Sequence, residues 1–175
     1  MKNIKGKKLS SLKLKREKKI IVAVSGGFDP IHIGHIRMFK EAKSFGDELV
    51  VILNNDNWLK QKKGFVFMPQ EQRKEIIEAI NGVNKVIFTK HAKYPKDMSV
   101  CAELKSLRPD IFVNGGDRNK KDAGDKSSFL NSDQMLCHKL GIKMIFNVGR
   151  GGKVQSSSEL VKKFLNNQKM FPKNI

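Results

Sequence analysis

Two histidines, spaced three positions apart, form the strongest chemical signal in this sequence. His32 and His35 end the segment Ser25-Gly26-Gly27-Phe28-Asp29-Pro30-Ile31-His32-Ile33-Gly34-His35 and make up half of the four histidines of the chain. Each imidazole can donate a hydrogen bond to a phosphate oxygen and stabilise charge that develops in a transition state. Gly34 leaves room for a phosphate between the two rings. The pair therefore predicts chemistry on a phosphate group.

The residues around the histidines support this interpretation. A short β-branched run precedes Gly26 and Gly27, and a helical pattern follows the histidines. The two glycines let backbone N–H groups approach a ligand closely, and the start of a helix attracts anions. The alternative is structural, with one histidine capping the helix and the other packed in the core. The flanking glycines and the turn from strand to helix favour the phosphate site.

Short β-branched runs alternate with helical patterns from residue 20 onward, which predicts an α/β fold with a parallel sheet covered by helices on both faces. We expect strands at 20–24, 49–53, 86–88, 111–114 and 143–147. The first helix carries an apolar stripe from Ile36 to Phe45 and is expected to end at Gly46. Further helices are expected between Pro69 and Gly82, at 98–107, at 132–140 and at about 157–166, the last opened by a Ser156/Glu159 capping box. The polar segments 57–68 and 115–131 are expected to be active-site loops.

Length, charge and composition set limits on the whole chain. Its 175 residues suit a single domain, which we place at 20–167, with a basic tail at 1–19 and a short tail at 168–175. No stretch approaches the ~20 apolar residues that a membrane span needs. Two separate cysteines predict neither a disulfide framework nor a zinc site, and the cytoplasm is the expected compartment.

The net charge of +18 is partly a property of the tail. The first nineteen residues hold nine Lys or Arg and one Glu, so that +10 remains on the other 156 residues. Such a tail is expected to be disordered, or to act as an electrostatic arm for nucleic acid or anionic surfaces.

The histidine segment resembles the cytidylyltransferase-like nucleotidylyltransferase family, whose signature is G-x-F-D followed by H-x-G-H. The residues that match in register are Gly26, Phe28, Asp29, His32, Gly34 and His35. The resemblance continues through the basic segment 60–63, Arg73, Pro109-Asp110 and Gly115-Gly116-Asp117, and covers roughly residues 20–165. It implies a Rossmann-like open parallel five-stranded sheet in a single domain.

The resemblance also implies roles for individual residues. His32, His35 and either Lys60 or Lys62 would hold the triphosphate, and Arg73 would help to bind the incoming phosphate or the triphosphate. Without the resemblance, such lysines and such an arginine are ordinary exposed charges.

The same family pattern assigns residues to the nucleotide. The turn Gly115-Gly116-Asp117-Arg118 would lie beside the base or ribose, and it is otherwise a simple turn. Ser156, Ser157 and Ser158 would donate hydrogen bonds to the β- and γ-phosphates, although helix capping also explains them. Many relatives carry Lys or Arg near Glu159, and cytidylyltransferases for glycerol or choline phosphates often carry R-T-E-G-I-S-T where this chain has residues 150–156. Arg150 or Lys153 is the candidate for the missing charge.

The implied reaction needs no protein nucleophile. A phosphate monoester is ionised at neutral pH because its second pKa is ~6, so its oxygen can attack the α-phosphate of ATP or CTP and release pyrophosphate. Mg²⁺ would bind mainly through substrate phosphates, with Asp29 or Asp117 as possible ligands. The sequence favours neither ATP nor CTP. The resemblance implies a sugar phosphate rather than a polyol phosphate as acceptor, and it also implies a homodimer because relatives are often dimers.

A non-catalytic alternative follows from the charge. A basic protein that binds nucleic acid on a nucleotide-binding fold would show steep salt dependence and release no pyrophosphate.

Overall fold

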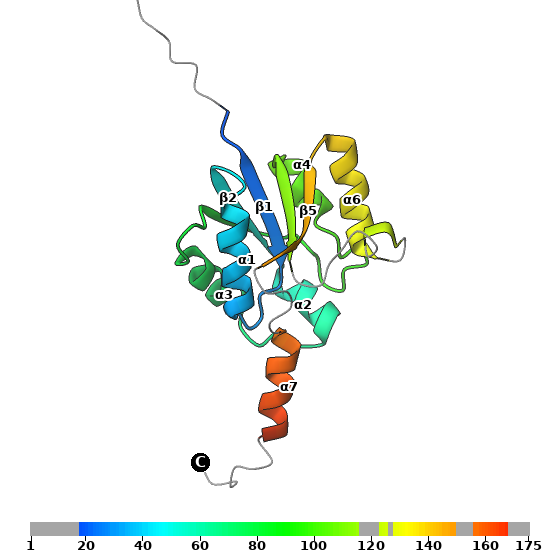
Figure 1. Cartoon of the computed structure of the whole chain (residues 1–175). Coiled ribbons are helices and arrows are strands. Elements are labelled where there is room, and N and C mark those ends of the chain that lie inside the picture. Colours follow the sequence, from blue (N-terminus) through cyan, green and yellow to red (C-terminus); the bar gives the residue numbers. More distant parts are fainter. Residues whose placement is uncertain (1–17, 116–122, 126–127, 150–155, 168–175) are drawn as a thin grey trace, which may run out of the picture.

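The structure, a computed structural model, describes residues 18–115, 123–125, 128–149 and 156–167 (Figure 1). Its five strands form one parallel sheet in the order β3-β2-β1-β4-β5. The strands are β1 (Ile21–Gly26), β2 (Glu48–Leu53), β3 (Lys85–Phe88), β4 (Ile111–Gly115) and β5 (Lys143–Val148). The helices within the described residues are α1 (Ile33–Lys43), α2 (Asp56–Lys63), α3 (Gln70–Glu78), α4 (Cys101–Leu107), α6 (Phe129–Leu140) and α7 (Ser157–Asn167). The predicted fold class is confirmed, and every expected strand lies within two residues of its predicted ends.

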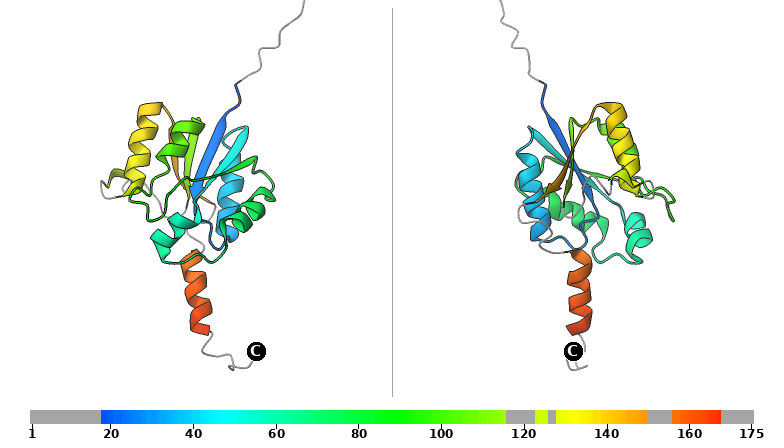
Figure 2. Two further views of the ribbon diagram at one scale, coloured as in Figure 1. Left: turned by 180° about the vertical axis from the view of Figure 1, so that it is seen from behind. Right: turned by 45° about the vertical axis from the view of Figure 1, so that its right-hand side comes forward.

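Helices cover both faces of the sheet (Figure 2), and an apolar layer lies beneath the helices on each face. On one face, Val24 and Val51 pack with Phe39 of α1 and Ile77 of α3. On the other face, strand residues that point the opposite way pack with Leu104 of α4 and Cys137 of α6; these strand residues are Ala23, Ile52 and Phe112. Because side chains alternate along a strand, each central strand supplies both layers.

The carboxyl ends of the strands meet at one edge of the sheet, where the connections to α1 and α2 begin (Figure 1). Helix α7 starts at this edge and extends away from the sheet. Its expected capping by Ser156 is confirmed, since the Ser156 hydroxyl accepts a hydrogen bond from the Glu159 N–H at 3.1 Å.

The segment 57–68 differs from the expected loop because most of it belongs to α2. The Asn55 side chain caps this helix by accepting from the Trp58 N–H at 3.0 Å, and Gly64 ends it with a φ of 83°. Asn at the N-cap and glycine in the left-handed region are strong helix boundaries, and the lysine-rich composition of the segment concealed them.

The last two residues of the predicted basic tail form ion pairs. Lys18 pairs with Asp110 at 2.7 Å, and Lys19 pairs with Glu48 at 2.6 Å. The rest of the tail and residues 168–175 lie outside the described residues.

No helix in the described part of the chain is long and apolar enough to cross a membrane.

The expected end of the first helix at Gly46 is wrong. Helix α1 ends at Lys43 with Ser44 as its cap, and Gly46 instead lies against the start of β1. A Cβ atom at position 46 would lie 2.8 Å from the Ile20 carbonyl oxygen and 2.7 Å from Val22 Cγ2. Glycine is required here for close approach of two backbone segments.

We therefore expect Gly46→Ala to lower the free energy of unfolding by about 1–3 kcal/mol, since the new methyl group must displace backbone. Urea unfolding followed by circular dichroism measures this. Gly124→Ala is the matched control, because a Cβ atom there meets nothing within 4 Å. Equal stability of the two variants would contradict the packing argument.

Candidate active site

The turn after β1 is shaped by its two glycines and an unusual phenylalanine. Phe28 has a φ of 49° and is buried, with its ring beneath the end of the strand. A Cβ atom on Gly26 would lie 2.7 Å from that ring, and one on Gly27 would lie 2.7 Å from Leu59 Cδ2. The Phe28 ring then meets the edge of the His35 ring, with 4.9 Å between the centroids. The turn therefore fixes the position of the second histidine.

Asp29 is fully buried and holds the next segment of the chain to this turn. Its two carboxylate oxygens accept hydrogen bonds from the Phe67 and Met68 N–H groups, at 2.9 and 2.7 Å. With both oxygens engaged away from solvent, Asp29 does not fit the expected role of a Mg²⁺ ligand. We interpret it as a residue that positions the turn.

The two histidines cap α1 and face each other. The Nδ1 atom of His32 accepts from the Gly34 N–H at 3.2 Å, and the Nδ1 atom of His35 accepts from the His32 N–H at 3.3 Å. Their rings stack with centroids 3.7 Å apart and 25° between the planes. Rings this close leave no room for a phosphate between them, so the expected role of Gly34 is wrong. The glycine instead makes room for the His32 ring, because a Cβ atom at position 34 would lie 3.0 Å from it. Because both Nδ1 atoms accept, the neutral rings carry their protons on Nε2.

Burial keeps both rings neutral. It lowers the pKa of His35 to about 3, with smaller contributions from His32 and Lys63. Burial also lowers the pKa of His32, and the charge of Lys63 acts in the same direction. At neutral pH the site thus presents two Nε2–H donors that carry no charge of their own.

Lys63, which was not among the nominated lysines, is the one directed at the histidine turn. It is half-buried, its ammonium group donates to the Asp29 carbonyl oxygen at 2.6 Å, and burial lowers its pKa. Lys60 and Lys62 are exposed. Helical spacing could have found Lys63, because it lies four residues after the buried Leu59 and so shares its face of α2.

Arg73 is also placed differently from its expected role as a phosphate ligand. Its side chain is fully buried, and its guanidinium donates to three carbonyl oxygens and to the Asp56 carboxylate at 2.6 Å. The carbonyl groups belong to Gly27, Asn54 and Met68, at 2.6 to 2.8 Å. These bonds occupy four of its five N–H donors, so Arg73 positions the turn and α2 rather than binding phosphate.

One of the predicted serines contacts the same turn at the start of α7. The Ser157 hydroxyl donates to the Pro30 carbonyl oxygen at 3.0 Å, whereas Ser158 is exposed. The N-terminus of α7 therefore lies beside that of α1, and the two positive helix ends suit an anion.

The remaining nominated residues lie at or beyond β4. Gly115 has a packing role, since a Cβ atom there would lie 3.0 Å from the Val148 carbonyl oxygen and within 2.9 Å of the Met38 side chain. The other members of the group lie outside the described residues, namely Gly116, Asp117, Arg118 and Arg150. Among the described residues, no group of three or more His, Cys, Asp or Glu side chains could hold a metal ion.

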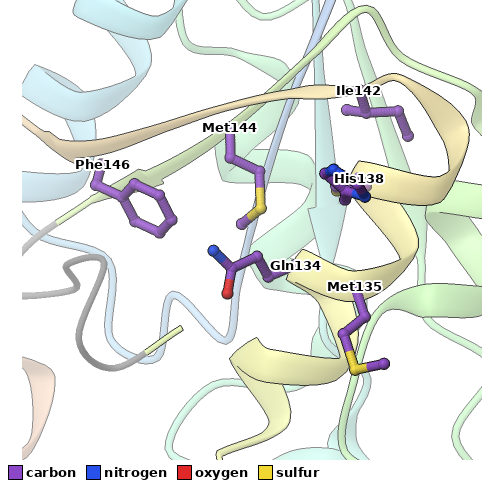
Figure 3. Close-up of a pocket in the computed structure, with 7 residues that line it drawn as sticks. Gln134, Met135, His138, Ile142, Met144 and Phe146 are labelled. Carbon is purple, nitrogen blue, oxygen red and sulfur yellow. The ribbon is translucent and has the colours of Figure 1, made fainter. Parts of the chain in front are cut away.

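A pocket of about 530 Å³ lies elsewhere, between α6 and the edge strand β5 (Figure 3). Its lining is mostly apolar and includes Gln134, Met135, His138, Ile142, Met144 and Phe146. It contains none of the nominated residues, and α6 covers the opposite face of the sheet from α1. The chemistry is therefore assigned to the strand ends and not to this pocket.

The burial of His35 leads to a prediction about its protonation. Its ordinary pKa of 6.5 falls to about 3 on folding, so the unfolded chain binds this proton first as the pH drops. The stability due to the neutral ring is complete above pH 6.5 and is lost progressively towards pH 3. Long-range ¹H–¹⁵N spectra at pH 5 should show the neutral Nε2–H form of His35 in the folded protein and a protonated ring in urea. A folded-state ring that is protonated at pH 5 would refute the assignment.

Comparisons with known proteins place the chain among its relatives. The sequence model described as cytidylyltransferase-like matches residues 23–145. FAD synthase of Pyrococcus horikoshii is 38% identical over 104 residues, which are 59% of this chain and 67% of that protein. Bifunctional protein HldE of Koribacter versatilis is 32% identical over 105 residues, which are 59% of this chain and 20% of that protein.

Solved structures show the same architecture. The lipopolysaccharide core biosynthesis protein of Thermoplasma volcanium matches with a TM-score of 0.59 and 28% identity, over 75% of this chain and 98% of that one. Pantoate-beta-alanine ligase of Francisella tularensis, at 16% identity and a TM-score of 0.55 over 93% of this chain and 74% of that one, shares the fold. The family match covers most of the described domain and includes both histidines, and the chain therefore belongs to the cytidylyltransferase-like family of nucleotidyltransferases.

Proposed function

We propose that this protein transfers AMP from ATP to FMN, forming FAD and releasing pyrophosphate. The observation that carries the transfer chemistry is the pair of neutral Nε2–H donors at the start of α1, beside the Lys63 ammonium group. Archaeal proteins named FAD synthase, 36 to 38% identical to this chain over about 60% of its length, support ATP as donor and FMN as acceptor.

In the proposed reaction, a phosphate oxygen of FMN attacks the α-phosphorus of ATP. The new O–P bond forms as the bond between the α-phosphorus and the bridging oxygen breaks, and pyrophosphate leaves with the electron pair. FMN carries a phosphate monoester that is ionised at neutral pH, so no protein base is required.

The protein's contribution is to position two anions and to stabilise the charge that moves to pyrophosphate. His32 and His35 donate from Nε2, and Lys63 supplies a positive charge. The N-termini of α1 and α7 add their partial positive charges at the same place. Mg²⁺ bound through the phosphates would neutralise further charge, and Asp29, whose oxygens are engaged, would not ligate it.

A sugar phosphate is the second candidate acceptor. The HldE relative and the lipopolysaccharide core biosynthesis structure favour it, at 32 and 28% identity. The placement of Gly116, Asp117 and Arg118 beside the base or ribose and the charge supplied by Arg150 stay predictions from the sequence. The same holds for the homodimer, the cytoplasmic location and binding of nucleic acid by the basic tail.

The first experiment measures product formation by the full chain with Mg²⁺. ATP or CTP is supplied with FMN, riboflavin, sugar phosphates or glycerol phosphate, and both pyrophosphate and the nucleotide product are quantified by chromatography. We expect FAD from ATP and FMN, none from riboflavin, which lacks the attacking phosphate, and a loss of at least about a hundredfold in His35→Ala. Preferred use of CTP or of a sugar phosphate would refute the FMN assignment.

Lys63 is expected to contribute more to catalysis than its neighbours on α2. Lys63→Met should lower kcat/KM by about a hundredfold, because it removes the positive charge directed at the histidine turn. Lys60→Met and Lys62→Met should each have a smaller effect. Lys85→Met is the neutral control, because Lys85 is exposed at the amino-terminal end of β3, away from the carboxyl ends of the strands. A larger loss in either exposed lysine variant than in Lys63→Met would contradict this assignment.

A further inference from the structure

The only tryptophan of the chain, Trp58, lies beside the turn that joins β1 to α1. Trp58 is half-buried in the first turn of α2, and its indole N–H donates to the Met98 carbonyl oxygen at 2.9 Å. A Cβ atom on Gly27 would lie 3.5 Å from carbon Cζ3 of the indole ring. The ring is therefore anchored at one end and borders the turn that leads to the histidines.

Two buried polar atoms near the same strand ends, Asn54 Oδ1 and Asn114 Nδ2, have no hydrogen-bond partner in the described part of the chain. The Ser99 hydroxyl is equally buried and has only a weak partner, the Cys101 thiol. The three residues are at most 6% exposed. A buried polar atom without a partner costs about 1–3 kcal/mol. Two such atoms at one edge of a sheet, with a third group bonded only to a thiol, call for a ligand or ordered water that satisfies them.

These residues share one side of the sheet. Asn54 lies two positions after Ile52, and Asn114 two positions after Phe112, whose side chains pack on the α4 and α6 face. Alternation along the strands directs both asparagines to that face. Ser99 directly precedes Val100 in the same apolar layer and follows Met98, the residue that anchors Trp58. The histidines, on α1, lie towards the other face.

We propose that Trp58 is the stacking surface for the planar heteroaromatic ring of the acceptor, and that Asn54, Ser99 and Asn114 form hydrogen bonds with the polar edge of that ring. This inference rests on the proposed function, in which the acceptor is a flavin phosphate. The isoalloxazine ring has the required form, with an apolar body and a pyrimidine edge of alternating donors and acceptors. Its ribityl chain carries the phosphate away from the ring, past Gly27, to the histidines.

The chemistry of the three atoms matches such an edge. The Asn54 oxygen accepts, the Asn114 amide nitrogen donates, and the Ser99 hydroxyl does either. The ring of Trp58 supplies a flat surface with little conformational freedom to lose, because its Nε1 atom is already bonded. A sugar phosphate has hydroxyl groups for these atoms but no planar aromatic ring to stack on the indole.

The single tryptophan permits a direct binding test. Emission of Trp58 is recorded during titration of the full chain with FMN in Mg²⁺ without ATP, with free tryptophan as the correction for absorbed light. We expect saturable quenching. FMN affinity is measured independently by equilibrium dialysis, so that variants without tryptophan can be compared.

Two substitutions separate the aromatic face from the hydrogen bond. Trp58→Phe and Trp58→Leu both remove the bond to Met98, but only phenylalanine keeps an aromatic face. We expect the Kd for FMN to rise about tenfold or more in Trp58→Leu and by less than about threefold in Trp58→Phe. Asn114→Leu, which removes the polar group at similar size, should weaken FMN binding without lowering the melting temperature.

The binding and transfer measurements fail separately. Absence of quenching by FMN, or equal affinity in Trp58→Leu and wild type, overturns the stacking proposal even if FAD is formed. Quenching with loss of affinity in Trp58→Leu supports it even if no FAD appears, in which case only the proposed reaction fails. If the enzyme is active, the KM values of Trp58→Leu give a further test. A higher KM for ATP with an unchanged KM for FMN assigns the indole ring to the nucleotide base and overturns the stacking proposal.

Discussion

The buried guanidinium of Arg73 is the interaction on which the site depends. It donates hydrogen bonds to the Gly27 carbonyl group in the turn after β1, to the Asn54 carbonyl group after β2 and to the Asp56 carboxylate at the start of α2. Leaving such a buried charge without its partners costs several kcal/mol, so these three segments keep their relative positions or the local fold is lost. The orientation of α2 follows from this constraint, and with it the positions of Lys63 and Trp58.

The electrostatics of the site follow from burial of its donors. Two adjacent imidazolium ions would repel each other, and desolvation would penalise both, so the neutral forms prevail. Neutral Nε2–H groups still bind phosphate oxygens and need no proton transfer as the charge moves to pyrophosphate. The positive charge comes instead from Lys63 and from helix ends, whose dipoles are fixed by the fold. Hydrogen bonding and charge neutralisation are thus assigned to different groups.

Much of the fold could be predicted from the sequence because periodicity carries it. The β-branched runs predicted all five strands of the described sheet, and the spacing of the histidine segment predicted the candidate site. Burial of polar residues was not predictable in the same way. Arg73 and Lys63 look like ordinary helical charges in the sequence. Only the packing of their helices against the turn after β1 shows that Arg73, on α3, is buried and that Lys63, on α2, points to the turn. Gly46 was misjudged for a similar reason, since its need for close approach comes from the distant Ile20.

In the fold, a structural role and a chemical role of the histidines are compatible. His32 caps α1, and His35 packs against Phe28, as a purely structural interpretation requires. Capping uses only Nδ1, and the same hydrogen bonds that complete the helix determine which nitrogen carries the proton. The structural role is therefore the condition for the chemical one, because it leaves Nε2–H as the donor on both rings. The substitution His32→Asn separates the two roles. Asparagine keeps a side-chain acceptor that can cap α1, but it lacks the imidazole Nε2–H group.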